Sequence, residues 1–349
     1  MTEGCIFVTG GAGFIGTHFV QRAVADGRTV VTLDALTYAG NLSNLDDVRG
    51  AANHTFIEGS IADRALVTRL LAEHRPAAIV NFAAESHVDR SIDSPSSFVA
   101  SNIVGVYALL EAARETCLER DDFRFLHVST DEIYGSVADG AATEMDRYDP
   151  SSPYAASKAA ADHLVRAWNR TYGMPTIITN CTNNYGPRQF PEKLIPLIIA
   201  KALSEESLPL YGDGMQQRDW LHVSDHCHAL DLVLSRGQVG ETYNVASGKT
   251  RSNRDVVERI CAILDRKRPR EGGVLYQALI ENVADRPGHD RRYALDAEKI
   301  KRELGWTADT DFSDGLSDTV EWYLQNGQWV ESAAGKYDGA RMGTTERAR

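Results

Sequence analysis

The chain has 349 residues, and 37 lysines and arginines stand against 49 aspartates and glutamates, which gives a formal net charge of −12. This acidic balance argues against nucleic-acid binding, because no surplus of basic side chains exists to displace counterions from phosphates. We see no apolar run near the roughly 20 residues of a membrane helix. Five cysteines without a C-x-x-C pair favour reduced thiols over a disulfide framework or a zinc site. We therefore expect a cytoplasmic protein with no metal, membrane or nucleic-acid partner.

The first half of the chain alternates short apolar runs with amphipathic segments. The apolar runs lie at Cys5–Thr9, Thr29–Asp34, Thr55–Glu58, Ala77–Ala84, Phe123–Thr130 and Thr176–Asn180. The main amphipathic segments are Asp63–His74, Phe98–Cys117 and Tyr154–Tyr172. Strands that are apolar on both faces and separated by helices form a parallel sheet covered on two sides. Residues 1–183 are therefore predicted to be a doubly wound α/β domain.

The second half is punctuated by prolines and has a different organisation. A helix at Leu221–Arg236 and a strand at Glu241–Val245 are expected to return to the sheet, within residues 219–247. Residues 184–218 and 248–330 are predicted to form a smaller, mostly helical domain that binds substrate. Its expected helices are Arg254–Asp265, Ala297–Leu304 and Ser313–Gln325. Residues 331–349 are small and polar and are predicted to be a flexible tail.

A glycine-rich loop follows the first strand and opens a helix. Its glycines, Gly10, Gly13 and Gly16, allow a tight turn, a close approach of the backbone to a pyrophosphate, and packing of the helix on the strand. Asp34 ends the second strand, where a carboxylate can accept both ribose hydroxyls and would repel a 2′-phosphate. These features predict a Rossmann-type domain that binds NAD rather than NADP. The alternatives are a plain glycine-rich turn and an aspartate that caps a turn.

Tyr154 and Lys158 are four residues apart, on one face of a predicted helix that Ser152 and Pro153 begin. A nearby ammonium favours the phenolate, so Tyr154 could act as a base near neutral pH. The alternative is an exposed pair without a catalytic role. The pair lies about 24 residues after a strand that ends at Thr130, where doubly wound sheets place their chemistry.

Thr130, Asp131 and Glu132 lie together at the carboxyl end of that strand. The threonine hydroxyl could share a proton with Tyr154. Two adjacent carboxyl groups can serve as an acid and a base when their environments separate their pKa values. The alternative is an ordinary polar exit from a strand.

Several segments resemble the extended short-chain dehydrogenase/reductase family, and most closely its nucleotide-sugar dehydratase branch. They are VTGGAGFIG, LTYAGN, AAESHVDRSI, STDEIYG, SPYAASK, TNNYGP, FPEKLIP, GDG followed by RDWLHV, and DRPGHDRRYALD. The resemblance runs from about residue 5 to residue 325. The glycine loop and the Tyr-x-x-x-Lys pair are shared by the whole family. The Asp131–Glu132 pair is specific, because epimerases of this fold have no elimination to catalyse.

The resemblance implies a glucose attached to a nucleoside diphosphate, with dTDP-glucose favoured. Tyr154, aided by Lys158 and Thr130, would remove the C4 hydroxyl proton while the C4 hydride passes to NAD. Glu132 would then take the C5 proton, and a protonated Asp131 would assist departure of the C6 hydroxyl as water. Return of the hydride to C6 would give a 4-keto-6-deoxy sugar. The alternatives are UDP-glucose as substrate, a 4-epimerase or decarboxylase, and a non-catalytic NAD-binding regulator.

Further roles follow from the same resemblance. The residues implied at the NAD site are Gly10, Gly13, Phe14, Ile15, Gly16, Asp34, Leu36, Thr37, Ser60, Ile61, Phe82, Ala83, Ala84, Ser101, Tyr154 and Lys158. Ser60 stands where the family usually carries an aspartate, which puts one adenine contact in doubt. The residues implied at the substrate are Ser86, Thr130, Asn183, Glu192, Lys193, Leu194, Arg218, Asn253, Arg286 and His289.

Arg218, the charged group at residues 87–90, Cys181 and the two longest amphipathic segments allow further interpretations. Arg218 matches a diphosphate by its guanidinium fork, and the alternative is an ion pair with Asp213 or Asp219. The charged group at residues 87–90 favours an internally satisfied network, and Cys181 favours packing over nucleophilic chemistry. The resemblance also implies a homodimer, in which Phe98–Cys117 and Tyr154–Tyr172 pack against their copies as a four-helix bundle.

Overall fold

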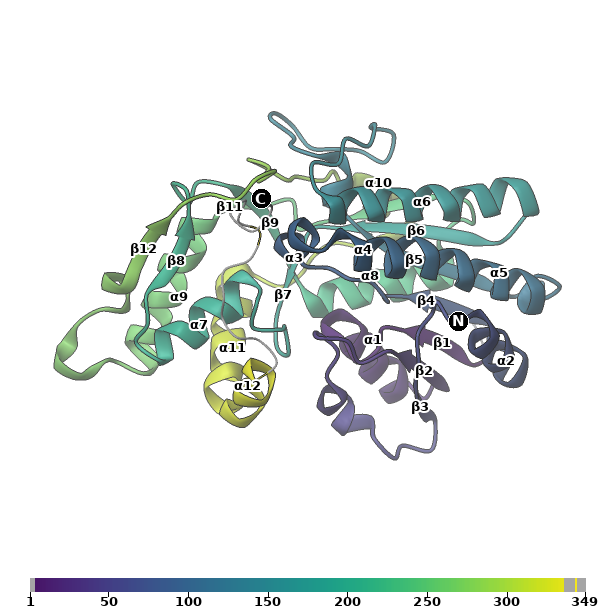
Figure 1. Ribbon diagram of the computed structural model, residues 1–349, viewed down its shortest axis with the longest axis horizontal. Coiled ribbons are helices and arrows are strands. Elements are labelled where there is room, and N and C mark those ends of the chain that lie inside the picture. Colours follow the sequence, from purple (N-terminus) through teal and green to yellow (C-terminus); the bar gives the residue numbers. More distant parts are fainter. Residues whose placement is uncertain (1–3, 336–342, 344–349) are drawn as a thin grey trace.

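The computed structural model describes residues 4–335 and residue 343, and its centre is a seven-stranded sheet (Figure 1). The strand order is β10-β6-β5-β4-β1-β2-β3, and every pairing is parallel. The strands are β1 (Ile6–Thr9), β2 (Val30–Asp34), β3 (His54–Glu58), β4 (Ala78–Asn81), β5 (Arg124–Thr130), β6 (Thr176–Cys181) and β10 (Thr242–Val245). This arrangement confirms the predicted Rossmann-type α/β fold. Its strand order reverses between β1 and β4, the crevice where such folds bind dinucleotides.

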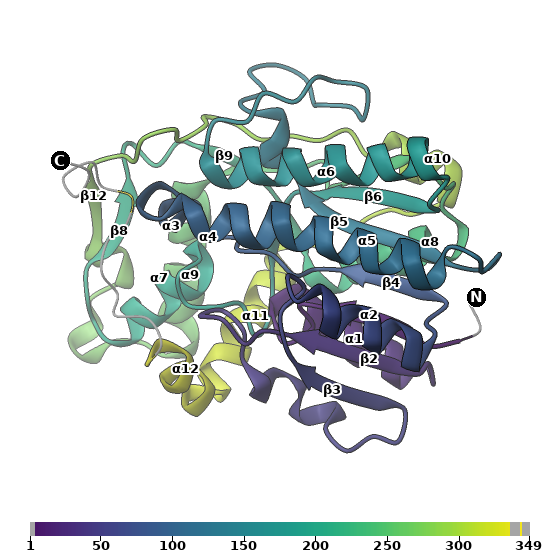
Figure 2. The ribbon, with the colours of Figure 1, turned by 45° about the vertical axis from the view of Figure 1, so that its right-hand side comes forward.

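Helices cover both faces of this sheet because its strands are apolar on both sides (Figure 2). Ile6 and Val8 of β1 face one apolar core, and Phe7 between them faces the other. The first core is closed by α1 (Phe14–Ala25), α8 (Val223–Arg236) and α10 (Glu298–Leu304). The second is closed by α2 (Arg64–His74), α5 (Val106–Cys117) and α6 (Pro153–Tyr172).

Helix α6 begins and ends as its sequence predicts. The Ser152 hydroxyl accepts a hydrogen bond from the Ala155 N–H, Pro153 occupies the first turn, and Gly173 ends the helix with a φ of +68°. The neighbouring helix is continuous but irregular, with α4 (Pro95–Phe98), a π-helical segment (Val99–Gly105) and α5. Among the described residues, this one helix, Pro95–Cys117, is long and apolar enough to cross a membrane by length and composition, which corrects our expectation from the sequence. Over half of its most apolar window, 56%, is buried within the fold.

The second half of the chain contains two small sheets that the sequence did not predict. One has the order β11-β9-β7, from β7 (Asn183–Tyr185), β9 (Gln217–His222) and β11 (Thr250–Ser252). The other pairs β8 (Leu208–Tyr211) with β12 (Ile280–Val283). They share an apolar core with α7 (Leu194–Leu203), α9 (Asn253–Lys267) and α11 (Phe312–Gln325). Shorter helices are η1 (Leu42–Val48), α3 (Val88–Asp93), η3 (Asp131–Tyr134), η4 (Glu271–Gly273) and η5 (Tyr276–Leu279).

The chain continues as a helix beyond the point where we expected it to fray. Helix α12 (Gly327–Ala334) includes the first residues of the predicted tail, so the prediction is wrong for residues 331–334. The helix forms because Trp329 and Val330 pack against the core of the second half. The rest of the predicted tail, apart from Gly335 and Gly343, lies outside the described residues.

Candidate active site

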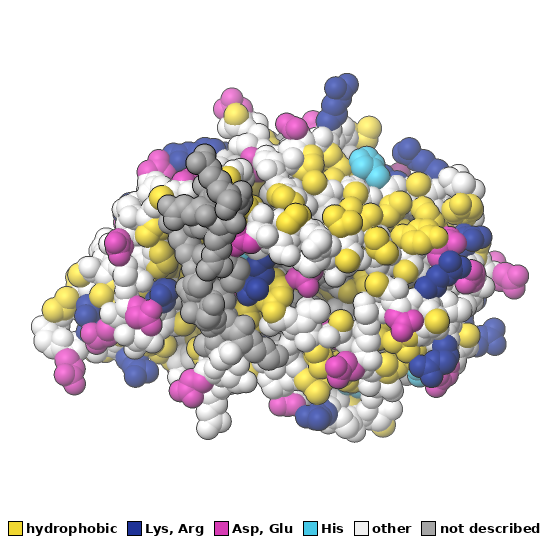
Figure 3. Space-filling view, in the orientation of Figure 1, with side chains coloured by type: hydrophobic (Ala, Val, Ile, Leu, Met, Phe, Trp, Pro, Cys, Tyr) yellow, Lys and Arg dark blue, Asp and Glu magenta, His cyan; other side chains and the backbone are white. Residues whose placement is uncertain are grey.

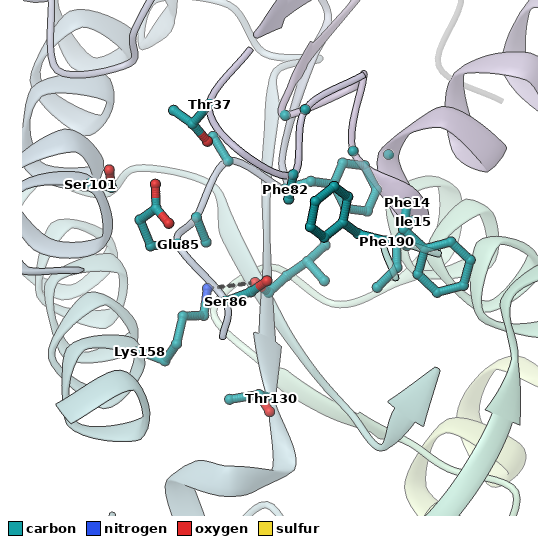
Figure 4. Close-up of a pocket in the computed structure, with 18 of the residues that line it drawn as sticks. Phe14, Ile15, Thr37, Phe82, Glu85, Ser86, Ser101, Thr130, Lys158 and Phe190 are labelled. Carbon is teal, nitrogen blue, oxygen red and sulfur yellow. Dashed lines mark hydrogen bonds between the residues drawn. The ribbon is translucent and has the colours of Figure 1, made fainter. Parts of the chain in front are cut away.

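A cleft runs along the carboxyl ends of the central strands (Figure 4). Phe14, Ile15, Phe82 and Phe190 lie on one side of it, Thr37, Glu85 and Ser101 on the other, and Lys158 and Thr130 at the base of the view. Predicted residues that line it are Gly10, Gly13, Phe14, Ile15, Gly16, Asp34, Thr37, Ser60, Ile61, Phe82, Ala83, Ala84, Ser86, Ser101, Thr130, Asp131, Glu132, Tyr154, Lys158, Asn183 and Lys193. The predicted site residues that do not line the cleft are Leu36, Glu192, Leu194, Arg218, Asn253, Arg286 and His289.

The glycine-rich loop has no room for side chains. Gly10 has a φ of +70°, and a Cβ atom there would lie 2.6 Å from the Ala83 backbone nitrogen. A Cβ atom at Gly16 would collide with the Gly10 carbonyl oxygen. Gly13 is the N-cap of α1 and uses no side chain to satisfy the first N–H groups of the helix. The loop therefore leaves a helix N-terminus open to an anionic diphosphate.

Asp34 connects the glycine-rich loop to the turn after β2. One carboxylate oxygen accepts the Ala12 N–H at 2.9 Å, and the other accepts the Leu36 N–H at 2.8 Å. Asp34 is thus held at the end of β2, where a carboxylate in this type of fold binds ribose hydroxyls. Leu36 has a φ of +46° and lies in the turn that follows β2. The Ser60 hydroxyl accepts the Ala62 N–H at 3.1 Å.

The structure brings the five predicted catalytic residues together at the end of β5. Thr130 is the N-cap of the short helix η3, and its hydroxyl lies 3.3 Å from an Asp131 carboxyl oxygen. The same hydroxyl interacts with the Tyr154 phenol, which α6 brings to this point. Lys158, one turn further along α6, donates to the Val128 carbonyl oxygen at 2.9 Å.

The two carboxyl groups after Thr130 have different surroundings. Asp131 is 3% exposed, and one of its oxygens has no hydrogen-bond partner among the described residues. Burial, followed by the charge of Glu132, raises the pKa of Asp131 well above its ordinary value. Burial also raises the pKa of Glu132, but Arg286, Lys193 and Arg218 oppose that rise. Asp131 is thus the better proton donor of the pair, and Glu132 the better acceptor.

The pKa of Tyr154 differs from our expectation. Burial, and then the charge of Glu132, raises it well above 10, and the Thr130 hydroxyl rather than Lys158 is the group that lowers it. Burial also lowers the pKa of the Lys158 ammonium. A phenolate at Tyr154 therefore requires additional positive charge near the ring, which a bound nicotinamide would contribute.

Arg218 is buried, and its charge lowers the pKa of both carboxyl groups. Its guanidinium donates to the Gln217 carbonyl at 2.8 Å and the Asp290 carbonyl at 2.9 Å, and it lies 4.1 Å from the centre of the Tyr293 ring. The alternative ion pairs are absent among the described contacts. Asp213 pairs with Arg291, and Asp219 accepts hydrogen bonds from Ser247 and Gly248.

A charged network joins the two halves of the chain beside the cleft. Arg90 pairs with Glu192 at 2.9 Å, and Asp89 pairs with Arg286 at 3.0 Å. The His87 ring nitrogen Nδ1 accepts a hydrogen bond from the Arg90 backbone N–H. Residues 87–90 therefore lie in a network of hydrogen bonds and ion pairs, as predicted, although the buried Glu192 Oε1 has no hydrogen-bond partner among the described residues. This network also explains why Glu192 and Arg286 do not line the cleft.

The remaining predicted substrate residues surround this network or begin nearby helices. Lys193 donates to the Ser86 carbonyl oxygen at 2.7 Å, and His289 contacts Asp285 at 2.6 Å. Leu194 and Asn253 are the first residues of α7 and α9, and the Asn253 side-chain oxygen is buried without a partner among the described residues.

Several residues that line the cleft were not predicted from the sequence, among them Glu85, Gln189 and Phe190. Glu85 and Phe190 fall within quoted segments, AAESHVDRSI and FPEKLIP, so their positions were a usable signal. Gln189 gives no such signal. Cys181 also lines the cleft, but burial raises its pKa to about 12 and its thiol lies 3.4 Å from the Ser129 carbonyl, which confirms the packing interpretation.

Comparisons with known proteins agree with this geometry. The model of a family described as GDP-mannose 4,6 dehydratase matches residues 7–319. A dTDP-glucose 4,6-dehydratase of Xanthomonas campestris pv. campestris is 59% identical over 345 residues, which cover 97% of this chain and 98% of the relative. The dTDP-glucose 4,6-dehydratase 1 of Escherichia coli K12 is 52% identical and covers 94% of each chain. The crystal structure of DesIV, a dTDP-glucose 4,6-dehydratase from Streptomyces venezuelae with NAD and TYD bound, has a TM-score of 0.88 at 45% identity, covering 94% of this chain and 99% of that one.

Proposed function

The chain belongs to the NAD-dependent epimerase/dehydratase family, matched by the GDP-mannose 4,6 dehydratase model, and we propose that it is a dTDP-glucose 4,6-dehydratase. The reaction is the conversion of dTDP-glucose to dTDP-4-keto-6-deoxyglucose with loss of water. Identity of 52–59% to curated dehydratases over nearly the whole chain supports the substrate. The observation that carries the reaction type is the Asp131–Glu132 pair, because oxidation and reduction alone need no such pair.

The residues of the cleft fit NAD. The side-chain-free glycine loop leaves space for a diphosphate at the N-terminus of α1, and Asp34 stands where an adenosine ribose would present its hydroxyls. Tyr154 and Lys158 would meet the nicotinamide end of the cofactor. When bound, NAD supplies an acceptor for a hydride and returns that hydride later in the same turnover.

Tyr154 begins the reaction as a general base. Its phenolate takes the proton of the sugar C4 hydroxyl. The Thr130 hydroxyl, which contacts the Tyr154 phenol, orients the phenolate for this step. The resulting 4-ketone acidifies the C5 hydrogen, which the Glu132 carboxylate removes. Asp131, held neutral by burial, donates its proton to the C6 hydroxyl, which leaves as water. The C5–H bond and the C6–O bond break, a C5–C6 double bond forms, and later reduction at C6 and protonation at C5 complete the 4-keto-6-deoxy sugar.

The second half of the chain holds the nucleoside diphosphate. Arg218 is already fixed by two carbonyl groups and by the Tyr293 ring, so its guanidinium is prepared for a diphosphate without a large loss of side-chain entropy. Lys193, which lines the cleft, supplies a second cation. The proposed substrate site is completed by Asn183, which lines the cleft, and by five residues that lie outside its lining, namely Glu192, Leu194, Asn253, Arg286 and His289.

The active protein is proposed to be a cytoplasmic homodimer. Hydrophobic side chains gather on the face over α5 and α6 (Figure 3). Val99 and Val104 are 48% and 50% exposed, and Tyr107 and Tyr172 are 42% and 44% exposed. Exposed apolar side chains grouped on two neighbouring helices are typical of an interface. Two copies joined through these helices would form the four-helix bundle expected from the sequence, which sedimentation of the wild type and a Val104→Glu variant would test.

The function is tested by incubating the purified protein with dTDP-glucose or UDP-glucose in deuterated water and analysing the products by mass spectrometry. Loss of one water, with one solvent deuterium at C5, is the expected result with dTDP-glucose. Faster conversion of UDP-glucose than of dTDP-glucose would show that the enzyme prefers a uracil nucleobase to thymine. An unchanged sugar formula with an inverted C4 centre would replace the dehydratase with an epimerase.

A further inference from the structure

Helix α12 is connected to the glycine-rich loop through the side chain of one asparagine, Asn44. The Trp329 indole N–H donates to the Asn44 side-chain oxygen at 2.8 Å, although the two residues are 285 positions apart. The Asn44 side-chain nitrogen in turn donates to the Ala12 carbonyl oxygen at 2.9 Å. Ala12 lies between the glycines of the cofactor loop, so two hydrogen bonds in series join α12 to that loop.

Asn44 is held firmly enough to transmit this restraint. It is 1% exposed, and its backbone carbonyl accepts both the Thr17 hydroxyl and the Gln21 amide of α1 at 2.9 Å. Arg188 and Asp47 form an ion pair at 2.6 Å between the second half of the chain and the same short helix η1. Trp329 therefore acts on a residue that is already fixed to the glycine-rich loop and to α1.

An aromatic cluster anchors Trp329 and reaches a second wall of the cleft. The Trp329 ring lies 5.1 Å from the Trp322 ring and 6.1 Å from the Tyr323 ring, centre to centre. The Tyr323 hydroxyl donates to the Gln189 carbonyl at 2.7 Å, and Gln189 lines the cleft. Helices α11 and α12 are thus bonded both to the glycine-rich loop, through Asn44, and to the loop after β7.

We propose that Trp329 is a positioning residue that, through Asn44, holds the glycine-rich loop in place and slows release of NAD. This inference rests on the proposed function, in which a hydride removed from C4 must be returned to C6 within one turnover. A reduced cofactor that left between these steps would strand the sugar as an unsaturated ketone. The two hydrogen bonds that connect Trp329 to the glycine-rich loop through Asn44 oppose that loss.

The test compares Trp329→Phe with Trp322→Phe in the full-length protein. Both substitutions remove an indole from the same cluster and leave a ring. Of these two tryptophans, only Trp329 donates its indole N–H in a hydrogen bond among the described contacts. The rate of NADH release is measured by stopped-flow fluorescence after displacement with excess NAD, and NAD content is measured after gel filtration. We expect NADH release from Trp329→Phe to be roughly 3- to 10-fold faster than from the wild type, which is the scale of one neutral hydrogen bond. The rate of NADH release from Trp322→Phe should stay within about twofold of the wild-type rate.

Asn44→Asp provides a second variant, because an aspartate still accepts the indole N–H but cannot donate to Ala12. It should release NADH at least as fast as Trp329→Phe. Equal acceleration by both tryptophan variants would assign the effect to aromatic packing and overturn the proposal, as would an unchanged rate in Trp329→Phe. Thermal melting of each variant separates slow unfolding from release. A wild type that binds NAD but forms no dehydrated sugar would remove the proposed function, and the comparison of release rates would still decide the role of Trp329.

Discussion

Replacing Asp131 with asparagine separates its chemistry from its structural role. The side chain is 3% exposed, and burial raises its pKa well above the ordinary value, which favours the neutral acid in the folded protein. Asparagine has the same size and is also neutral. It keeps an oxygen that can accept the Thr130 hydroxyl, now 3.3 Å away. We therefore expect the free energy of unfolding at pH 7 to change by no more than about 1 kcal/mol.

The catalytic effect of Asp131→Asn should be much larger than its effect on stability. An amide cannot give a proton to the departing C6 hydroxyl, and a positioned general acid contributes about 10²- to 10⁴-fold to a rate. At about 1.36 kcal/mol for each factor of ten, this range corresponds to roughly 2.7–5.4 kcal/mol in the barrier. Oxidation at C4 precedes this step and depends on Tyr154, so it should continue.

Two signals measured on the same sample test this prediction. Mass spectrometry follows the loss of water from dTDP-glucose, and absorbance at about 340 nm follows the reduced nicotinamide formed by oxidation at C4. The expected result is slow water loss with a persistent absorbance signal and a melting temperature near that of the wild type. Water loss within tenfold of the wild-type rate would show that Asp131 is not the acid. Loss of both signals in a folded variant would place Asp131 in the oxidation step.

Three further predictions concern neighbouring residues. Glu132→Gln should abolish deuterium incorporation at C5 while part of the C4 oxidation survives, and normal turnover would refute its role as the base. Tyr154→Phe should lower the rate of reduced-cofactor formation by about 10²- to 10⁴-fold with NAD binding retained, and unchanged formation would place the base elsewhere. Asp162 has a pKa raised by burial from 3.8 to about 6, so the wild type loses stability as pH rises between these values, and Asp162→Asn does not. The melting temperature of Asp162→Asn minus that of the wild type should therefore increase from pH 4 to pH 7, and a constant difference would contradict the assignment.

Local patterns predicted the parts of the site that depend on neighbouring residues in the sequence. The glycine spacing after β1, the serine–proline start of α6 and the polar residues after β5 each fix their own backbone conformation. The parallel sheet then brings them together, because the carboxyl ends of its strands lie at one edge. Tyr154 needed only its position on α6 to be placed beside Thr130.

Contacts between distant segments were beyond this kind of prediction. Strands β8 and β12 pair Leu208 with Ile280, and neither four-residue segment has a pattern that identifies its partner. Arg218 looked like a charge in a polar loop, but the chain folds Asp290 and Tyr293 against it. Residues 331–334, the second half of helix α12, were assigned to a tail because that part of the sequence is small and polar. The helix forms because Trp329, which precedes them, meets an aromatic cluster that only the folded chain creates.

The different roles of Asp131 and Glu132 also arise from distant segments. The two residues are adjacent in the chain, and burial raises the pKa of both carboxyl groups. Arg286 and Lys193, which come from the second half of the chain, are the largest opposing influences on Glu132 alone. The strand end therefore supplies two similar acids, and cations from the second half of the chain oppose the rise in the pKa of Glu132. Because Arg218, the residue proposed to bind the diphosphate, comes from the same half, folding of that half brings the proposed diphosphate site and the cations that act on Glu132 into place together.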